Sequence, residues 1–238
     1  MTPRHVHPSV FLLLILPFGV MSGYLTVTLA WQLAHHGISV EQVSTLVAIS
    51  FIPHTWKFLW APIADSVWTR KGWYVLASVL SAAGMFAMGA LPTTAASLPL
   101  LTIVVVVANV AVTFVGMSGE SLLAYGCAEN EKGRAAGWFQ AGNLGGNGLG
   151  GGAGLWLAQR VPEPWMPGAV LALACLVCMV GLVMLPEPPQ THRGAHLGHT
   201  LANVAKDVWG VARQRLGFLA LVLCFMPIGS GAATGLWF

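Results

Sequence analysis

Two charged side chains, Lys57 and Glu120, lie well inside apolar stretches of this sequence. A charge in hydrocarbon costs about 2.5–3.5 kcal/mol even on lenient insertion scales, so such residues usually serve a function. Lys57 precedes Asp65 by eight residues and Glu120 precedes Glu129 by nine. At about 1.5 Å per helical residue, the two charges reach a similar depth and can pair. Because a nearby ammonium stabilises a carboxylate, loss of the pair would favour protonation of the acid. Such a switch can couple a proton to a second event.

Each charge also has a simpler interpretation. The long stem of Lys57 can extend toward the lipid headgroups beside Trp56 and Trp60, as lysines near membrane interfaces do. Glu120 can lie at headgroup level if its helix ends early, near Ser118. The sequence leaves these alternatives open.

The segment from Ala135 to Ala158 carries the clearest packing pattern. Glycines recur at every fourth position: Gly142, Gly146, Gly150 and Gly154. A stripe without side chains lets another helix backbone come very close. Asn143 and Asn147 form an adjacent polar stripe that can bond a neighbouring helix or face a watery cavity. Helix packing is the favoured role, and a phosphate-binding loop is excluded because no lysine follows the glycines.

Glycine and proline also interrupt two other apolar segments. Pro17, Gly19 and Gly23 lie in the first, and Pro227, Gly229 and Gly231 lie at a comparable depth in the last. Paired interruptions of this kind are typical of a binding site between repeats. Kinking alone is the alternative.

The elements that must position these residues are membrane-spanning helices. Hydrophobic residues make up 56% of the chain, charged residues make up 8%, and the mean hydropathy is +0.73, which is too apolar for a soluble domain of 238 residues. A helix needs about 20 apolar residues to cross the hydrocarbon core. The runs of that size are Val10 to Leu33, Val43 to Ala64, Trp73 to Leu91, Leu98 to Tyr125, Ala135 to Ala158, Met166 to Leu185 and Gly217 to Phe238. We expect an all-α polytopic membrane protein, with the lipid bilayer as its first partner.

Basic residues set the orientation of these helices, because cytoplasmic connectors collect lysine and arginine. With the N-terminus inside, the cytoplasmic connectors hold Arg4, Arg70, Lys71, Lys132, Arg134, Arg193, Lys206, Arg213 and Arg215. The outer connectors hold only Arg160. We therefore predict a multi-pass protein of the cell inner membrane with a cytoplasmic N-terminus.

The connector after the sixth run divides the chain. We predict a six-helix transmembrane bundle over residues 1–185, a cytoplasmic loop with an amphipathic helix over 186–216, and the start of a second bundle over 217–238. No charge follows the last run, so we expect a chain truncated after Phe238, derived from a twelve-helix protein that is monomeric when full length.

Other chemistries find little support in the sequence. The basic residues form no stripe or recognition motif, which argues against nucleic acid. His192, His196 and His199 have no acid or cysteine beside them to complete a metal site, and Cys175 and Cys178 are expected to be small core residues. No hydrolase or metalloprotease motif is present in the sequence. We predict neither an enzyme nor a bound cofactor.

Two segments resemble a known transporter group. FIPHTWKFLWAPIADSVWTRKGW, from Phe51 to Trp73, resembles the helix-two and loop 2-3 signature of major facilitator transporters of the muropeptide-permease (AmpG) and acetyl-CoA transporter group. AENEKGRAAGWFQ, from Ala128 to Gln140, is similar to the loop 4-5 pattern of that group. The resemblance covers the whole chain in helix order.

The resemblance implies a rocker-switch transporter with alternating access, usually driven by a proton gradient. Asp65, Arg70 and Lys71 would form the gating loop, and Lys57 would be the helix-two lysine of the group. Glu120 matches an acid of helix four. The muropeptide permeases have a preceding acid where this chain has Gly116. The loop pattern of major facilitators in general has a glycine where this chain has Ala61 and commonly a basic residue where it has Ser66.

The leading hypothesis is a secondary transporter of a medium-sized polar solute such as a muropeptide, with protons as the coupling ion. Lys57, Glu120, Asn143 and Asn147 are its candidate substrate or proton-coupling residues. A siderophore importer of the same superfamily is the close alternative. A non-transporting membrane scaffold or receptor is the second alternative.

Overall fold

The computed structural model describes residues 6–55, 57, 68–185, 206, 209–210, 213–214 and 217–219. The chain divides into two units, Met1–Arg193 and Gly194–Phe238. The predicted loop 186–216, with its three histidines, and the predicted span 217–238 lie almost wholly outside the described residues. In the second unit, Lys206, Trp209 and Gly210 are helical, and the Arg213 guanidinium lies 5.2 Å from the centre of the Trp209 ring.

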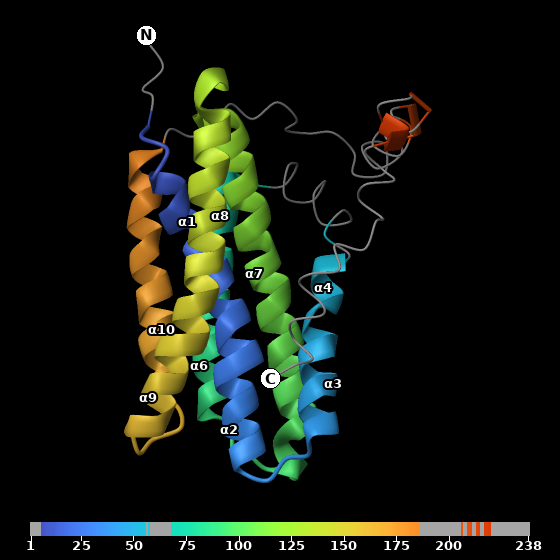
Figure 1. Ribbon diagram of the computed structural model, residues 1–238, viewed down its shortest axis with the longest axis vertical. Coiled ribbons are helices and arrows are strands. Elements are labelled where there is room, and N and C mark those ends of the chain that lie inside the picture. The colour runs from blue at the N-terminus through green and yellow to red at the C-terminus, as the bar shows by residue number, and fades with distance from the viewer. Residues whose placement is uncertain are drawn as a thin grey trace. The chain divides into compact units, whose positions relative to one another are not determined.

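The first unit is helical throughout its main elements (Figure 1). The first helix comprises α1 (Val10–Gly23), a π-helical turn (Tyr24–Leu29) and α2 (Ala30–His35). The second comprises α3 (Val40–Ser50) and α4 (Ile52–Thr55), followed by Lys57. The third helix is α6 (Arg70–Ala90), and the fourth is α7 (Leu98–Gly126). The fifth comprises α8 (Lys132–Gly148), a π-helical turn (Leu149–Ala153) and α9 (Gly154–Arg160). The sixth comprises α10 (Met166–Val177) and a 3₁₀ segment (Cys178–Met184).

Four of these stretches are long and apolar enough to cross a membrane: Val10–His35, Arg70–Ala90, Ala95–Gly126 and Met166–Met184. They correspond to the first, third, fourth and sixth predicted runs. The fifth predicted run is helical from Lys132 to Arg160, but its glycines and asparagines lower its hydropathy. Of the second predicted run, residues 56 and 58–64 lie outside the described part.

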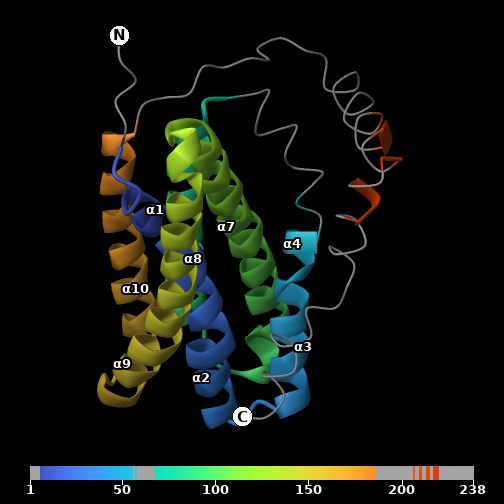
Figure 2. The same cartoon turned by 45° about the horizontal axis from the view of Figure 1, so that its top comes forward.

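The glycine stripe joins the first and fifth helices, and α1 and α8 lie side by side in both views (Figures 1 and 2). β-carbons added to Gly142 and Gly146 would lie 2.3 and 2.5 Å from the carbonyl oxygens of Leu12 and Leu16. The contact is reciprocal, because a β-carbon on Gly19 would lie 2.1 Å from the Asn143 carbonyl oxygen. The two backbones therefore touch directly, as small-residue packing in membranes allows.

A buried threonine bridges the π-helical turns of these two helices. Backbone hydrogen bonds in a π-helical turn span one more residue than in an α-helix. The Thr28 hydroxyl lies 2.8 Å from the Gly150 carbonyl oxygen and 3.3 Å from that of Gly151. Thr28 thus links the two helices by a buried hydrogen bond.

Two sequence-based alternatives are corrected by the helix boundaries. The fourth helix does not end near Ser118, because α7 continues to Gly126, so Glu120 is a helical residue. The first helix is not broken at Pro17, which lies inside α1. Its irregularity comes about two turns later, at Tyr24–Leu29. Pro227, Gly229 and Gly231 lie outside the described residues.

Candidate functional site

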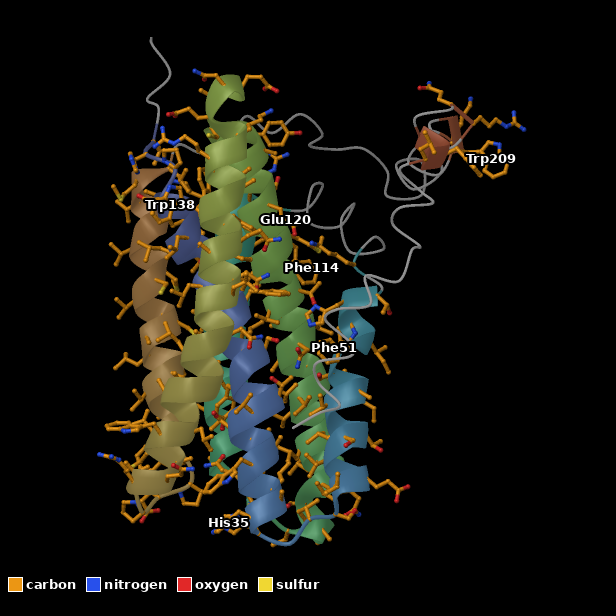
Figure 3. All side chains as sticks on the ribbon, in the orientation of Figure 1. His35, Phe51, Phe114, Glu120, Trp138 and Trp209 are labelled. Carbon is orange, nitrogen blue, oxygen red and sulfur yellow. The ribbon has the colours of Figure 1, made fainter. Side chains whose placement is uncertain are left out.

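Lys57 and Glu120 form an ion pair between the second and fourth helices. The Lys57 ammonium lies 2.6 Å from both carboxylate oxygens of Glu120. Figure 3 labels Glu120 on α7 and Phe51 at the α3–α4 junction that faces this helix. The sequence predicted that the two charges lie at a similar depth, and in the structure they are in direct contact.

The pair lies on an accessible face of the bundle. The Lys57 and Glu120 side chains are 38% and 52% exposed. A charged pair at membrane depth is strongly disfavoured against lipid tails and is found facing water or protein instead. This face of α4 and α7 is therefore suited to line a water-filled cavity or to meet other protein groups.

A second polar cluster lies one turn before Lys57. His54 Nε2 is 3.3 Å from the side-chain oxygen of Asn109, and His54 Nδ1 is 2.9 Å from the Thr113 hydroxyl. Asn109 and Thr113 are buried in α7, where Asn109 donates its amide to the Val105 carbonyl at 2.8 Å. Both ring nitrogens of His54 are thus held by one helix.

A cavity of about 240 Å³ adjoins this cluster. Its walls come from the first, second and fourth helices and combine aromatic rings with hydroxyl, amide and imidazole groups. The lining residues are Phe18, Ser22, Leu25, Thr26, Ser50, Phe51, His54, Asn109 and Val112. The Phe18 and His54 rings meet edge to face, with centroids 5.4 Å apart. The cavity can hold a small polar group against an aromatic face.

The two asparagines of the fifth helix have different surroundings. Asn147 donates to the Ser22 hydroxyl at 3.1 Å, so it reaches the wall of the cavity through Ser22. The Asn143 amide lies 3.4 Å from the Gln140 side-chain oxygen on its own helix. The structure therefore connects Asn147, but not Asn143, to the cavity cluster.

The residues of the expected gating loop are only partly described. Asp65 lies outside the described residues. The Arg70 guanidinium lies 4.4 Å from the centre of the Tyr125 ring at the end of α7. Lys71 donates to the Leu185 carbonyl at the end of the sixth helix. Both basic residues therefore contact neighbouring helix ends in this state.

Gly116 lies against the Phe18 ring, which an acidic side chain at this position would displace. A β-carbon on Gly116 would lie 3.2 Å from the Phe18 ring. The ring and a carboxylate cannot share this space without movement of Phe18, which packs on His54. The Phe18 ring therefore occupies the space that a side chain at position 116 would need.

Sequence reasoning missed His54, Asn109 and Thr113. A usable signal was present, because Asn109 and Thr113 are four residues apart and lie on one face of an otherwise apolar helix. That spacing, with a histidine one turn before Lys57, marks a polar stripe beside the charge pair.

The remaining possible sites are weaker. Among the described residues, no group of three metal-ligating side chains gathers in one place. Of the two cysteines of the sixth helix, Cys175 is buried and Cys178 is partly buried. Neither residue lines the cavity.

Comparisons with known proteins identify the family of this chain. The sequence model of the Major Facilitator Superfamily matches residues 11–238. The structure is similar to the inward-open xylose transporter XylE from E. coli, with a TM-score of 0.60 and 16% sequence identity over 77% of this chain. The chain spans about half of that transporter, covering 49% of its length. No curated protein matches the sequence. This all-α, multi-pass membrane chain belongs to the Major Facilitator Superfamily.

Proposed function

We propose that this chain is part of a secondary transporter that moves a medium-sized polar solute by alternating access, coupled to protons. The observation that carries the proposal is the Lys57–Glu120 pair at 2.6 Å on an accessible face of the bundle. An intramembrane pair between two helices can open and close as the helices shift, and its opening changes the proton affinity of the carboxylate. Superfamily membership favours this role over that of an enzyme, scaffold or receptor.

The size of the cavity supports a solute shared with a second half. Pockets for drug-sized ligands usually measure about 300–1,000 Å³, whereas the described cavity measures about 240 Å³. It can hold one ring or side group, and the rest of a larger solute would contact other parts of the transporter. Aromatic and polar walls suit a solute such as a muropeptide, which carries sugar rings.

Location and topology are part of the proposal. We place the chain in the cell inner membrane with a cytoplasmic N-terminus, a six-helix bundle over 1–185, a cytoplasmic loop over 186–216 and a second bundle beginning at 217. Asp65, Arg70 and Lys71 are proposed to act in the gating loop between the second and third helices. Full-length monomers are expected.

Uptake into proteoliposomes tests the proposal. Labelled muropeptide and labelled siderophore are offered with an imposed proton gradient, without one, and with the gradient collapsed by a protonophore. Gradient-stimulated uptake of muropeptide, lost in Lys57→Met and Glu120→Gln, is expected. Preferential siderophore uptake would assign the alternative substrate, and no uptake of either solute under any gradient would remove the proposal in favour of a receptor or scaffold.

A further inference from the structure

The hydrogen bonds around His54 fix which forms of its ring the site can hold. Asn109 directs its amide nitrogen to the Val105 carbonyl at 2.8 Å, so its side-chain oxygen faces His54 Nε2. That oxygen only accepts hydrogen bonds. Nε2 must therefore carry a proton. In the neutral tautomer protonated only on Nδ1, the bare Nε2 and the Asn109 oxygen would both be acceptors and could not form a hydrogen bond.

The Thr113 hydroxyl can serve two forms of the ring. Its oxygen lies 2.9 Å from His54 Nδ1 and 2.7 Å from the Asn109 carbonyl oxygen. A hydroxyl donates one proton and can also accept. With neutral His54, Thr113 donates to Nδ1. With the cationic ring, Nδ1–H donates to Thr113, which then donates to the Asn109 carbonyl.

We infer that His54 is a reversible proton-binding site, in which rotation of the Thr113 hydroxyl exchanges the neutral ring for the cationic ring. Every hydrogen-bonding group of the cluster has a partner in both forms. A buried polar group costs little when it is fully bonded and much when it is not. The site thus accommodates both charge states with a rotation of one hydroxyl.

The surrounding charges connect this site to the ion pair. On its own helix, Lys57 is one turn from His54 and acts on it electrostatically. On α7 the charged group is Glu120, which holds Lys57. Phe18, Ser22 and the other described lining residues from the first helix and α3 carry no charge. Glu120 offsets part of the Lys57 charge while the pair is closed, and a freed ammonium would repel a cationic His54 more strongly.

The use of this proton in transport rests on the proposed function. Opening of the Lys57–Glu120 pair would expel the proton from His54, and closing of the pair would allow it to return through the adjoining cavity. Proton binding itself rests on the hydrogen bonds alone, so the two ideas can fail separately.

The test is ring ¹⁵N NMR of the full chain in liposomes, with ¹⁵N-labelled histidine and pH varied from mildly alkaline to acidic. His54→Gln assigns the signal, and the exposed His35 and His36 serve as references. We expect the Nε2–H tautomer at high pH and a doubly protonated ring at low pH. A ring neutral throughout the range, or an Nδ1–H tautomer, would overturn the inference.

Variants of α7 separate the proposed exchange from general packing. Thr113→Val removes the hydroxyl at constant shape, so the fraction of protonated His54 at a given acidic pH should fall, whereas Thr113→Ser should retain it. Thr102→Val is the matched control, because Thr102 donates to the Leu98 carbonyl on the same helix without a histidine partner. Equal protonation in Thr113→Val and Thr102→Val would contradict the inference. Normal titration with no gradient-driven uptake would instead remove the proposed function.

Discussion

Gly150 packs directly against the backbone of Val20, so closely that an added β-carbon would lie 2.1 Å from the Val20 carbonyl oxygen. Gly150→Ala must therefore push the first and fifth helices apart. We expect it to lower the free energy of unfolding by about 1–3 kcal/mol, as overpacking does, although alanine is the better helix former. Unfolding in detergent micelles, followed by circular dichroism, measures the change.

Gly148→Ala is the matched control, because nothing lies within 4 Å of a β-carbon at Gly148. Alanine there should be neutral or should stabilise the helix by up to about 1 kcal/mol. Equal effects of the two substitutions would contradict direct backbone contact at Gly150.

The Lys57–Glu120 pair predicts rescue by charge exchange. Lys57→Glu and Glu120→Lys should each abolish gradient-driven uptake, because each leaves two like charges facing one another. The double exchange restores an opposite pair and should regain part of the lost uptake. Lys132→Met, which removes the 2.7 Å pair with Glu129, should have little effect, since exposed pairs contribute about 0–1 kcal/mol. Absence of any rescue would argue against a working pair.

Thr28→Val tests the bridge between the π-helical turns. The valine keeps the shape but removes the 2.8 Å hydrogen bond to the Gly150 carbonyl, which should lower the free energy of unfolding by about 0.5–1.5 kcal/mol. Thr45→Val is the control, because Thr45 donates to the Glu41 carbonyl on an exposed helix face. Equal melting temperatures for the two variants would show that the bridge contributes nothing.

Cys127 reports the orientation of the chain, because it follows α7 in a predicted cytoplasmic connector. In a variant that keeps only this cysteine, an impermeant maleimide should label inside-out vesicles and leave sealed right-side-out vesicles unlabelled. The opposite labelling would invert the topology.

The pH dependence of that labelling has a definite sign. Burial, with a smaller contribution from the Glu131 carboxylate, raises the pKa of the Cys127 thiol. Since the thiolate is the reactive form, labelling should be slow at neutral pH and should keep rising beyond the pH at which an ordinary thiol is ionised. Glu131→Gln should increase the rate at neutral pH, and an unchanged rate would exclude the carboxylate's influence.

The parts of the structure that follow from the sequence depend on strong single-residue signals. Charges in apolar runs are costly, so the positions of Lys57 and Glu120 could be identified by counting residues along two helices. Glycines spaced by four mark one helix face, and the structure places that face against α1. The spans of the first, third, fourth and sixth helices followed from length and hydropathy alone.

The parts that did not follow depend on contacts between distant segments. In the sequence, His54 is a single histidine between Pro53 and Thr55. Its role becomes visible only in the structure, where α7 supplies hydrogen-bond partners for both ring nitrogens. Likewise, nothing in the sequence near Gly23 indicates a π-helical turn. That turn is stabilised by a threonine and carbonyl groups that are far apart in the chain.

The π-helical turn at Leu149–Ala153 explains how all four glycines of the stripe face the first helix. In a straight α-helix every fourth residue advances by about 40° around the axis, so three such steps would rotate Gly154 by about 120° from Gly142. A wider turn rotates the chain less per residue, which brings Gly154 back to the first helix, where a β-carbon would lie 2.4 Å from the Thr28 hydroxyl oxygen. Coiled coils correct this angular drift by winding around each other; this helix pair instead has one π-helical turn in each helix.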